Sequence, residues 1–475
     1  MPFLDRRRFL SASAAMSLTS LAACANSGGT EAMVFVRSGG IGRRAGGPNR
    51  QVLSGGYAAF PRADRQTWWR PEYSVDSFSR LDEIFAASTA RAAEWPSAWL
   101  RAAKEPAIRY SSPAFLGGRY DIDGYLDRNP VTGLLIARND TILVERYQYD
   151  RSDAMRLTSF SMAKTIVALL VGLAVEDGAI RSLDDPAETY APTLAGTEYG
   201  RTPVRNLLTM SSGVRFREDY DGADDSSKLS RATFGRATEG GSAAVRQFNE
   251  RVAAPGARWY YAASETYVLA MVVRAAAGKS LSALLQERIW RPMGAEADTT
   301  WLTDRSGLEI GFMGVNAVLR DYARLGRLLA NGGKVGERQL VPQAWIAAMT
   351  RPAFSAGQTG RPFGYGYQTW IHSANDGSFG LFGVRGQYLF VDPALRLVMV
   401  NTAVRTDPRD RGNADTFALW EAVRSMRAWA TATPSTDSTT SPPAPKPPSE
   451  SKSTWTVCAP GPSGPGAVTV VRSWP

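Results

Sequence analysis

The chain has 475 residues, of which 44% are hydrophobic, 10% aromatic and 21% charged, so it can bury a sizeable core. Its net charge of +10 comes from scattered arginines rather than a basic block, which disfavours nucleic-acid binding and favours a soluble basic enzyme. The chain has only two cysteines, Cys24 and Cys458, and one histidine, His372. These are too few and too scattered for a Cys/His zinc site, and a Ser-His-Asp triad would have to use that single histidine.

Residues 1–24 are typical of a bacterial export signal. The RRRFL segment at 6–10 resembles a twin-arginine signal, and the mild apolar run over 10–23 is too short to span a bilayer. That run ends in LAAC, which resembles a lipobox and predicts Cys24 as the lipidated first residue of the mature protein. The alternative is ordinary cleavage beside an incidental cysteine. The lipobox interpretation predicts an exported lipoprotein, anchored on the periplasmic or extracellular side of a bacterial envelope.

Two further segments lack the periodic apolar positions of a folded core. Residues 25–67 are rich in Gly, Ser and Arg, and we expect a tether or a poorly ordered arm. Residues 431–475 are dominated by Pro, Ser and Thr and cannot bury enough apolar surface to offset their conformational entropy, which predicts disorder. The globular domain is therefore expected over residues 68–430. No stretch after the signal is long and apolar enough for a transmembrane helix, so we expect this domain to be soluble.

Within the predicted domain, strands come first, helices fill the middle, and strands and a helix come last. Two apolar runs around the turn-forming pair Asn139-Asp140 predict a β-hairpin, and a second hairpin is expected around Pro393. The predicted elements are strands at 133–138 and 141–146, helices at 161–175, 267–277 and 281–290, strands at 387–392 and 397–401, and a helix at 413–430. This order predicts an α+β fold whose antiparallel sheet takes its two halves from opposite ends of the domain.

The candidate catalytic pair is Ser161 and Lys164, at the start of a predicted helix. A serine hydroxyl needs a base to take its proton, and residues i and i+3 share a helix face, so Lys164 can reach Ser161. The helix start offers N–H groups for an oxyanion, and its dipole together with desolvation favours a neutral lysine. A Ser-x-x-Lys sequence alone is weak, since an N-capping serine with a solvated lysine has the same spacing. The strongly apolar helix and the aromatic approach through Phe160 favour catalysis.

Several further motifs follow in order. They are SMAKT at 161–165, LLTMSSGV at 207–214, PGARWYY at 255–261 with SET at 264–266, Ile310-Gly311 through Asn316-Ala317 with LRDYAR at 319–324, and FGYGYQ at 363–368 with Gly386-Gln387. Together they resemble the serine β-lactamase and penicillin-binding-protein superfamily over residues 126–404, and most closely its class C-like esterases and 6-aminohexanoate-dimer hydrolases. The resemblance implies a β-lactamase/D,D-peptidase-like fold: an antiparallel sheet flanked by helices, with a helical subdomain inserted at about 185–301 and substrate between the two parts.

The resemblance also implies a role for Tyr261. Its phenol would share a proton with Lys164 and Ser161, as a general base and later as an acid toward the leaving group. The spacing from the preceding Pro-Gly pair selects Tyr261 rather than Tyr260. The alternative is a buried aromatic pair without a chemical role. Ala263 replaces the Ser or Asn of many relatives, which removes a polar contact to the substrate.

The third motif of the superfamily, Lys-Thr-Gly or His-x-Gly in penicillin-recognising members, matches an LFGV segment here. Leu381 removes the cation that would bind a substrate carboxylate, which argues against a β-lactamase or D,D-peptidase and for esters or uncharged amides. Gly383 permits close backbone approach, and the resemblance implies an oxyanion hole formed by the N–H groups of Ser161 and Val384. Arg385 is the candidate substitute for the missing charge near the substrate; the alternative is an exposed arginine at a strand end.

These features predict an exported serine hydrolase that cleaves an ester or amide through an acyl-enzyme on Ser161, without a metal or an organic cofactor. Its expected partners are a small-molecule substrate and the membrane that holds its lipid, with no nucleic acid, and the expected state is a monomer. One alternative is a cell-wall D,D-carboxypeptidase or β-lactamase, which would capture penicillin covalently. Another is a catalytically silent surface-binding lipoprotein, against which the intact Ser161, Lys164 and Tyr261 argue.

Overall fold

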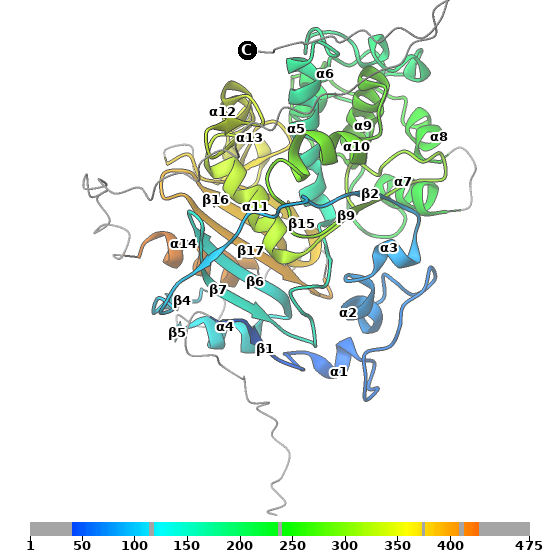
Figure 1. Ribbon diagram of the computed structural model, residues 1–475. Coiled ribbons are helices and arrows are strands. Elements are labelled where there is room, and N and C mark those ends of the chain that lie inside the picture. The colour runs from blue at the N-terminus through cyan, green and yellow to red at the C-terminus, as the bar shows by residue number, and fades with distance from the viewer. Residues whose placement is uncertain (1–39, 114–117, 236–239, 373–375, 408–412, 427–475) are drawn as a thin grey trace, which may run out of the picture. The chain divides into compact units, whose positions relative to one another are not determined.

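A nine-stranded sheet runs through the molecule, and its strands come from both ends of the described chain (Figure 1). The computed structural model describes residues 40–113, 118–235, 240–372, 376–407 and 413–426. The sheet has the order β1-β7-β6-β17-β16-β15-β14-β13, and β3 also pairs with β7. Its strands are β1 (Gly42–Arg43), β3 (Leu100–Arg101), β6 (Val131–Arg138), β7 (Thr141–Tyr147), β13 (Gly364–Tyr365), β14 (Trp370–Ile371), β15 (Phe379–Gly383), β16 (Gln387–Asp392) and β17 (Leu397–Ala403).

Both predicted hairpins are confirmed. β6 and β7 turn at Asn139, whose φ of 52° is a left-handed conformation that asparagine tolerates. β16 and β17 form the second hairpin, and β17 then pairs antiparallel with β6, with Val400 opposite Leu135. The early and late halves of the sheet, cyan and orange in Figure 1, therefore meet at this one pairing, as the α+β prediction required.

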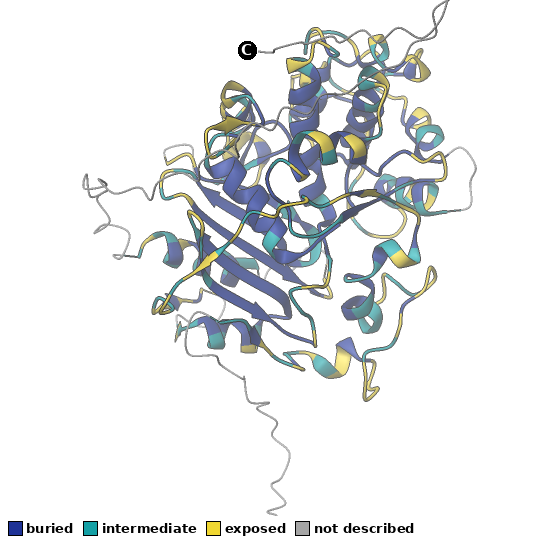
Figure 2. Ribbon diagram, in the orientation of Figure 1, coloured by how far each residue is buried: buried dark blue, intermediate teal, exposed yellow. Residues whose placement is uncertain are grey.

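Helices cover both faces of the sheet because alternate side chains of each strand point to opposite sides. On one face, Leu389 of β16 lies against Gly326 of α11 (Leu319–Ala330), where an added Cβ would come within 2.8 Å of the leucine Cδ1 atom. On the other face, Phe390 stacks on Trp420 of α14 (Asn413–Arg424) with a ring-centroid distance of 5.3 Å. The strands between these layers are buried, as Figure 2 shows in dark blue.

The central helix α5 (Ala163–Glu176) joins the sheet to a group of helices that falls within the predicted insertion. Every residue of α5 from Ala163 to Ala174 is buried, as expected of a helix that is apolar all round. The inserted elements are η3 (Ala187–Thr189), η4 (Pro192–Leu194), α6 (Val204–Leu208), α7 (Asp225–Phe234), α8 (Gly240–Gln247), α9 (Ala263–Ala277), α10 (Leu281–Leu285) and the π-turn η5 (Gln286–Trp290). Among the described residues no single helix is long and apolar enough to cross a membrane. The helices α9 and α10–η5 meet the length and composition criteria only when taken together, and this pair is bent by 75°.

A second sheet, β2-β9-β10-β8, lies next to the start of α5 and fixes the turn that precedes it. It consists of β2 (Ala87–Ala90), β8 (Leu157–Thr158), β9 (Thr299–Leu302) and β10 (Val315–Ala317). The smaller elements are α1 (Arg50–Leu53), η1 (Pro71–Tyr73), α2 (Ser74–Ser77), α3 (Leu81–Ile84), β4 (Tyr110–Ser111), β5 (Arg119–Tyr120), α4 (Ile122–Arg128), η2 (Phe160–Met162), β11 (Lys334–Val335), β12 (Arg338–Gln339), α12 (Gln343–Met349), α13 (Ala356–Thr359) and η6 (Val384–Gly386).

The expectation of a loose arm over residues 25–67 is wrong for residues 40–67, which pack on the domain. β1 adds a parallel strand to the edge of β7, the Tyr149 hydroxyl donates to the Pro48 carbonyl at 2.6 Å, and Leu53 is fully buried. Backbone pairing and single anchoring side chains hold this segment, which is why it shows no apolar periodicity. The predicted signal with Cys24, residues 25–39 and the predicted tail lie outside the described residues, as do the last residues of the helix predicted to reach Ala430.

Candidate active site

Ser161 lies in the short turn η2, directly before α5. Two hydrogen bonds tie this turn to β10: the Ser159 N–H donates to the Val315 carbonyl at 2.8 Å, and the Val315 N–H donates to the Ser159 Oγ at 3.1 Å. Phe160, immediately before the serine, has a φ of 41°, a strained conformation for a bulky side chain. The expected helix therefore begins two residues later than predicted, and Ser161 sits on a fixed turn at its entrance.

Lys164 lies one turn behind Ser161, as the spacing predicted. Its Nζ atom donates to the Ser161 Oγ at 2.9 Å and to the Phe312 carbonyl at 3.0 Å. The lysine is only 2% exposed, and this burial lowers its pKa from the usual 10.5 to about 8, against the opposing charge of Glu218. Near neutral pH a useful fraction of Lys164 is therefore neutral and can accept a proton.

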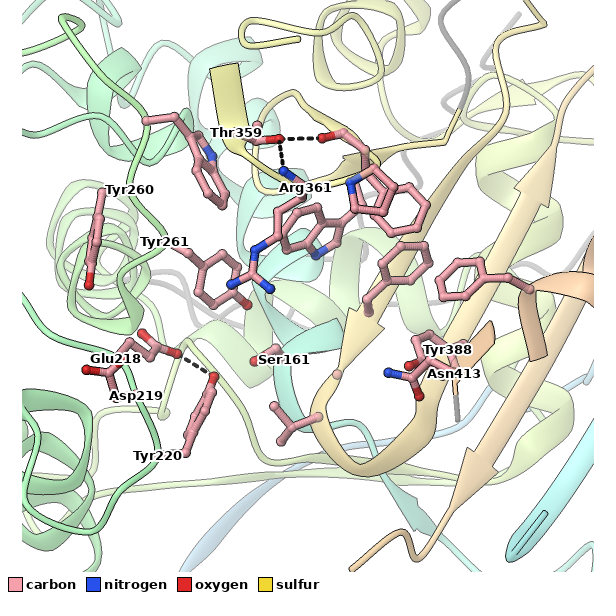
Figure 3. A pocket seen from close by; sticks show the side chains of 18 residues that line it. Ser161, Glu218, Asp219, Tyr220, Tyr260, Tyr261, Thr359, Arg361, Tyr388 and Asn413 are labelled. Carbon is pink, nitrogen blue, oxygen red and sulfur yellow. Dashed lines mark hydrogen bonds between the residues drawn. The ribbon is translucent and has the colours of Figure 1, made fainter. Parts of the chain in front are cut away.

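Tyr261, and not Tyr260, lies beside the pair. The Nζ of Lys164 is 5.0 Å from the centre of the Tyr261 ring, which stacks on Trp370 at 5.6 Å. Burial raises the pKa of Tyr261, and a hydrogen bond with Ser161 partly offsets the rise. Tyr260 is 41% exposed and its side chain points away from the serine (Figure 3). Because its pKa is raised while that of Lys164 is lowered, Tyr261 is suited to carry a proton rather than to start as the base.

Ser161 opens into a cavity of about 520 Å³ with aromatic walls (Figure 3). Its aromatic lining consists of Trp259, Tyr260, Tyr261, Phe363, Trp370, Phe382, Tyr388 and Phe417, among which Trp370 packs against both Tyr261 and Trp259. The polar or charged residues that line it are Ser161, Glu218, Asp219, Tyr220, Thr359, Arg361 and Asn413, together with the hydroxyls of the tyrosines. Such a cavity accommodates an apolar body with a few polar contacts near the serine.

The third motif lies where the resemblance implied, at the end of β15 beside the serine. Gly383 and Val384 line the cavity, whereas Leu381 is buried in the core and offers no charge. Arg385 does not fulfil the expectation of a cation near the substrate. Its Nη1 atom donates to the carbonyls of Arg405 at 3.0 Å and Thr406 at 2.7 Å, and it does not line the cavity.

The cavity residues that the sequence did not single out include Glu218, Tyr220 and Arg361. Glu218 accepts from the Tyr220 hydroxyl at 2.7 Å and from the Ala263 N–H at 2.6 Å, and burial raises its pKa while the charge of Lys164 opposes the rise. These residues come from loops and match no motif spacing.

Gln368, the last residue of the FGYGYQ motif, connects three elements behind the cavity. Its backbone carbonyl accepts from Thr165 at 2.6 Å, its side-chain oxygen accepts from Thr266 at 2.7 Å, and its amide group donates to the Leu207 carbonyl at 2.8 Å. It thereby ties α5, which carries Lys164, to α9 and to the LLTMSSGV segment. The motif is explained by this buried polar network.

The LLTMSSGV segment holds the tyrosine-bearing segment in register. The Tyr260 N–H donates to the Met210 carbonyl at 2.8 Å, and Glu265 accepts from the Ser212 hydroxyl at 2.6 Å. Burial raises the pKa of Glu265 to about 8. The remaining candidate, His372, packs against both Phe363 and Phe417 and does not line the cavity of Ser161. No cluster of three or more potential metal-binding His, Cys, Asp or Glu side chains occurs in the described ranges.

Comparisons with known proteins identify the family and the fold of this chain. The family model described as Beta-lactamase matches residues 122–424. A 6-aminohexanoate-dimer hydrolase of Paenarthrobacter ureafaciens is 26% identical over 385 residues, covering 78% of this chain and 94% of that protein. The solved structure named "Putative 6-aminohexanoate-dimer hydrolase from Bacillus anthracis" superposes with a TM-score of 0.68 at 22% identity, covering 76% of this chain and 96% of its own.

A second solved structure, "EstCE1, a hydrolase with promiscuous acyltransferase activity", has a TM-score of 0.51 at 17% identity and covers 63% of this chain and 96% of its own. At these identities the structural likenesses establish the fold, and the family match covers well over half of the chain. The protein is a hydrolase of the β-lactamase family.

Proposed function

We propose that this chain is an exported serine hydrolase that cleaves an ester or amide through an acyl-enzyme on Ser161. The observation that carries the proposal is the 2.9 Å hydrogen bond between Lys164 Nζ and Ser161 Oγ, made by a buried lysine whose pKa falls to about 8. A merely structural lysine gains nothing from desolvation beside a serine that opens into a cavity.

In the first half of the reaction, neutral Lys164 takes the proton of Ser161 while the Oγ atom attacks the substrate carbonyl carbon. The backbone N–H groups of Ser161 and Val384 stabilise the oxyanion that forms. The carbonyl then re-forms and the bond to the leaving oxygen or nitrogen breaks. Tyr261 donates its hydroxyl proton to that atom and takes the proton held by Lys164, so the leaving group departs neutral and Lys164 is again a base.

In the second half, a water molecule attacks the acyl carbonyl and gives its proton to Lys164. The bond between the carbonyl carbon and the Ser161 oxygen breaks, and that oxygen recovers a proton from Lys164 through Tyr261. The products are a carboxylic acid and the free enzyme.

The class of substrate rests on two observations. Leu381 stands where the usual strand cation would be, and one relative of this chain is named 6-aminohexanoate-dimer hydrolase. We therefore propose a linear ester or amide rather than a penicillin or a peptidoglycan stem peptide. Penicillin-binding members would need a substrate-binding cation on β15, which carries none in this chain.

A substrate panel tests this proposal. Wild type and Ser161→Ala are incubated with p-nitrophenyl butyrate, the linear dimer of 6-aminohexanoate and benzylpenicillin, and product release is measured. We expect wild type to hydrolyse the ester or the linear amide and to leave penicillin intact, and Ser161→Ala to be inactive. Penicillin turnover by wild type would establish the cell-wall alternative, and no turnover of any substrate by a folded wild type would favour a binding lipoprotein.

We also propose export and lipid anchoring through Cys24. The supporting observation is the order of the RRRFL segment, the apolar run and the LAAC sequence. Metabolic labelling with an alkynyl fatty acid in a bacterial host tests this proposal. Wild type should be labelled and should sediment with membranes, whereas Cys24→Ala should not be labelled and should not sediment with them. Equal labelling of the two proteins would contradict the proposal.

A further inference from the structure

Among the residues that the structure describes, Arg361 is the one cation that lines the cavity of Ser161, and it is exposed. It comes from the loop after α13 and not from β15, the strand that carries the third motif. Figure 3 shows its side chain reaching from the loop toward Tyr261 and Ser161. Its charge lowers the pKa of Tyr261 against the effect of burial, so the guanidinium acts on the side of the cavity where the tyrosine hydroxyl lies.

The backbone beneath Arg361 is fixed. Thr359 Oγ1 accepts from the Arg361 N–H at 3.2 Å and donates to the Phe363 carbonyl at 2.7 Å, while Gly360 adopts a φ of 63° to close the turn. A capping box between Ser355 and Gln358 starts the helix that leads into this turn. The loop therefore holds the start of the arginine side chain at a set place over the cavity.

The guanidinium itself has no ion pair and no hydrogen bond within the part of the chain that the structure describes. Neighbouring arginines differ in this respect, because Arg205 pairs with Asp184 and Arg385 binds two carbonyls. The acidic residues of the cavity are engaged elsewhere: Glu218 accepts from Tyr220 and Ala263, and Asp219 lies 3.4 Å from Arg217. Among the described residues the Arg361 guanidinium thus lines the cavity without an ion-pair partner of its own.

Resting on the proposed function, we propose that Arg361 binds a carboxylate on the leaving group of the substrate. The leaving atom must lie near Tyr261, which gives it a proton, and Arg361 reaches the same side of the cavity. Its planar guanidinium can bind a carboxylate with two parallel hydrogen bonds, a geometry that a lysine cannot reproduce. Trp370, which stacks on Tyr261, and its neighbour Phe363 line the same cavity and offer an apolar surface for a short linker.

Arg361 therefore takes over, from a different element, the role that the missing strand cation plays elsewhere in the superfamily. The substrates would be esters or amides whose alcohol or amine product carries a carboxylate a few bonds from the cleaved bond. This replaces the expectation from Leu381 alone, which favoured esters or uncharged amides, with substrates that carry a carboxylate on the leaving group.

Two matched esters test the inference: the butyryl ester of 4-hydroxybenzoate, which has an anionic leaving group, and that of 4-hydroxybenzamide, which is neutral and of the same shape. We expect wild type to prefer the carboxylate ester by about tenfold in kcat/KM, the size of one partly exposed charge-assisted contact. Arg361→Gln should lose this preference, because kcat/KM should fall about tenfold more for the carboxylate ester than for the neutral ester. Arg361→Lys should retain part of the preference.

The control is Arg258→Gln, which removes an exposed charge from the neighbouring surface but not from this cavity, and should keep the wild-type preference. Inhibition of wild type by free 4-hydroxybenzoate, stronger than by 4-hydroxybenzamide, is the second expected result and needs no variant. Equal use of the two esters by wild type, or an equal fall for both in Arg361→Gln, would overturn the inference while leaving the serine hydrolase intact. If wild type hydrolysed neither of these esters and no other ester or amide, the proposed function itself would be wrong.

Discussion

A Cβ atom added to Gly383 would lie 2.5 Å from the backbone carbonyl oxygen of Ser159 and 3.1 Å from the Cβ of Phe160. The first distance is shorter than van der Waals contact allows, and its partner is backbone that cannot turn aside. Only glycine therefore lets the end of β15 lie against the turn that carries Ser161. This approach brings Val384 and Ser161 to the same cavity.

Replacing Gly383 by alanine should separate the two sides of the oxyanion hole. We expect Gly383→Ala to lower kcat/KM for an ester by about a hundredfold, since loss of one oxyanion donor costs this much or more in rate. The matched control is Gly357→Ala in α13, where the nearest atom to an added Cβ is 4.0 Å away. A fully active Gly383→Ala would show that Val384 does not serve as a donor.

The lowered pKa of Lys164 predicts a pH dependence of activity. Because only the neutral lysine can take the proton of Ser161, kcat/KM should rise with pH around a midpoint near 8 and then level off. Lys164→Met, which keeps the volume of the side chain, should lower kcat/KM at least a thousandfold and abolish this rise. An unchanged midpoint in Lys164→Met, measured on any residual activity, would assign the titration to another group.

The same lysine predicts a trend in stability. Its folded-state pKa of about 8 lies below the usual 10.5, so between these pH values the unfolded chain holds a proton that the folded protein has released. The free energy of unfolding should therefore gain a contribution from Lys164 as pH rises from 8 to 10.5. Urea unfolding of wild type and Lys164→Met across this range should show the gain in wild type only.

Glu265 predicts the opposite dependence of stability on pH. Its folded-state pKa of about 8 lies above its usual 4.5, so the folded protein holds a proton that the unfolded chain releases, and stability is lost as pH rises through this window. Glu265→Gln keeps an oxygen for the Ser212 hydroxyl and should remove that loss. Urea unfolding at pH 5 and pH 8 tests it: the variant should gain stability relative to wild type at the higher pH, and parallel curves would contradict the prediction.

Substitutions at two adjacent tyrosines test whether the Tyr261 hydroxyl transfers a proton or whether its ring serves only in packing. Tyr261→Phe keeps the ring that stacks on Trp370 but removes the hydroxyl, and should lower kcat at least a hundredfold. Tyr260→Phe alters an exposed residue on the same segment and should change kcat by less than about threefold. Equal effects of the two substitutions on ester hydrolysis would show that the Tyr261 hydroxyl transfers no proton.

Local sequence was enough to predict the parts of this molecule that local rules determine. The turn at Asn139, the two hairpins, the apolar helix behind Ser161 and the i, i+3 approach of Lys164 all follow from spacing and residue type. The β-lactamase-like α+β fold followed from the ordered motifs. The choice of Tyr261 over Tyr260 also needed the family resemblance, because either tyrosine would satisfy a pattern of buried aromatics.

Contacts between distant segments could not be predicted in this way. Arg361 reaches the cavity from the loop that follows α13, and Glu218 is held at the cavity by a hydrogen bond from the first turn of α9. Neither residue stands at a characteristic spacing from a motif. Arg385, one residue after the third motif, was a reasonable candidate for a substrate-binding cation. Its φ of 63° instead directs its side chain to the carbonyls of Arg405 and Thr406.

The most direct test of the account is intact-protein mass spectrometry of the purified chain after incubation with a fluorophosphonate, for wild type and Ser161→Ala. A serine that Lys164 activates should react, so the account predicts one covalent adduct on wild type and none on Ser161→Ala. Circular dichroism confirms in parallel that both proteins are folded. No adduct on folded wild type, or the same adduct on Ser161→Ala, would contradict the assignment of Ser161 as the nucleophile.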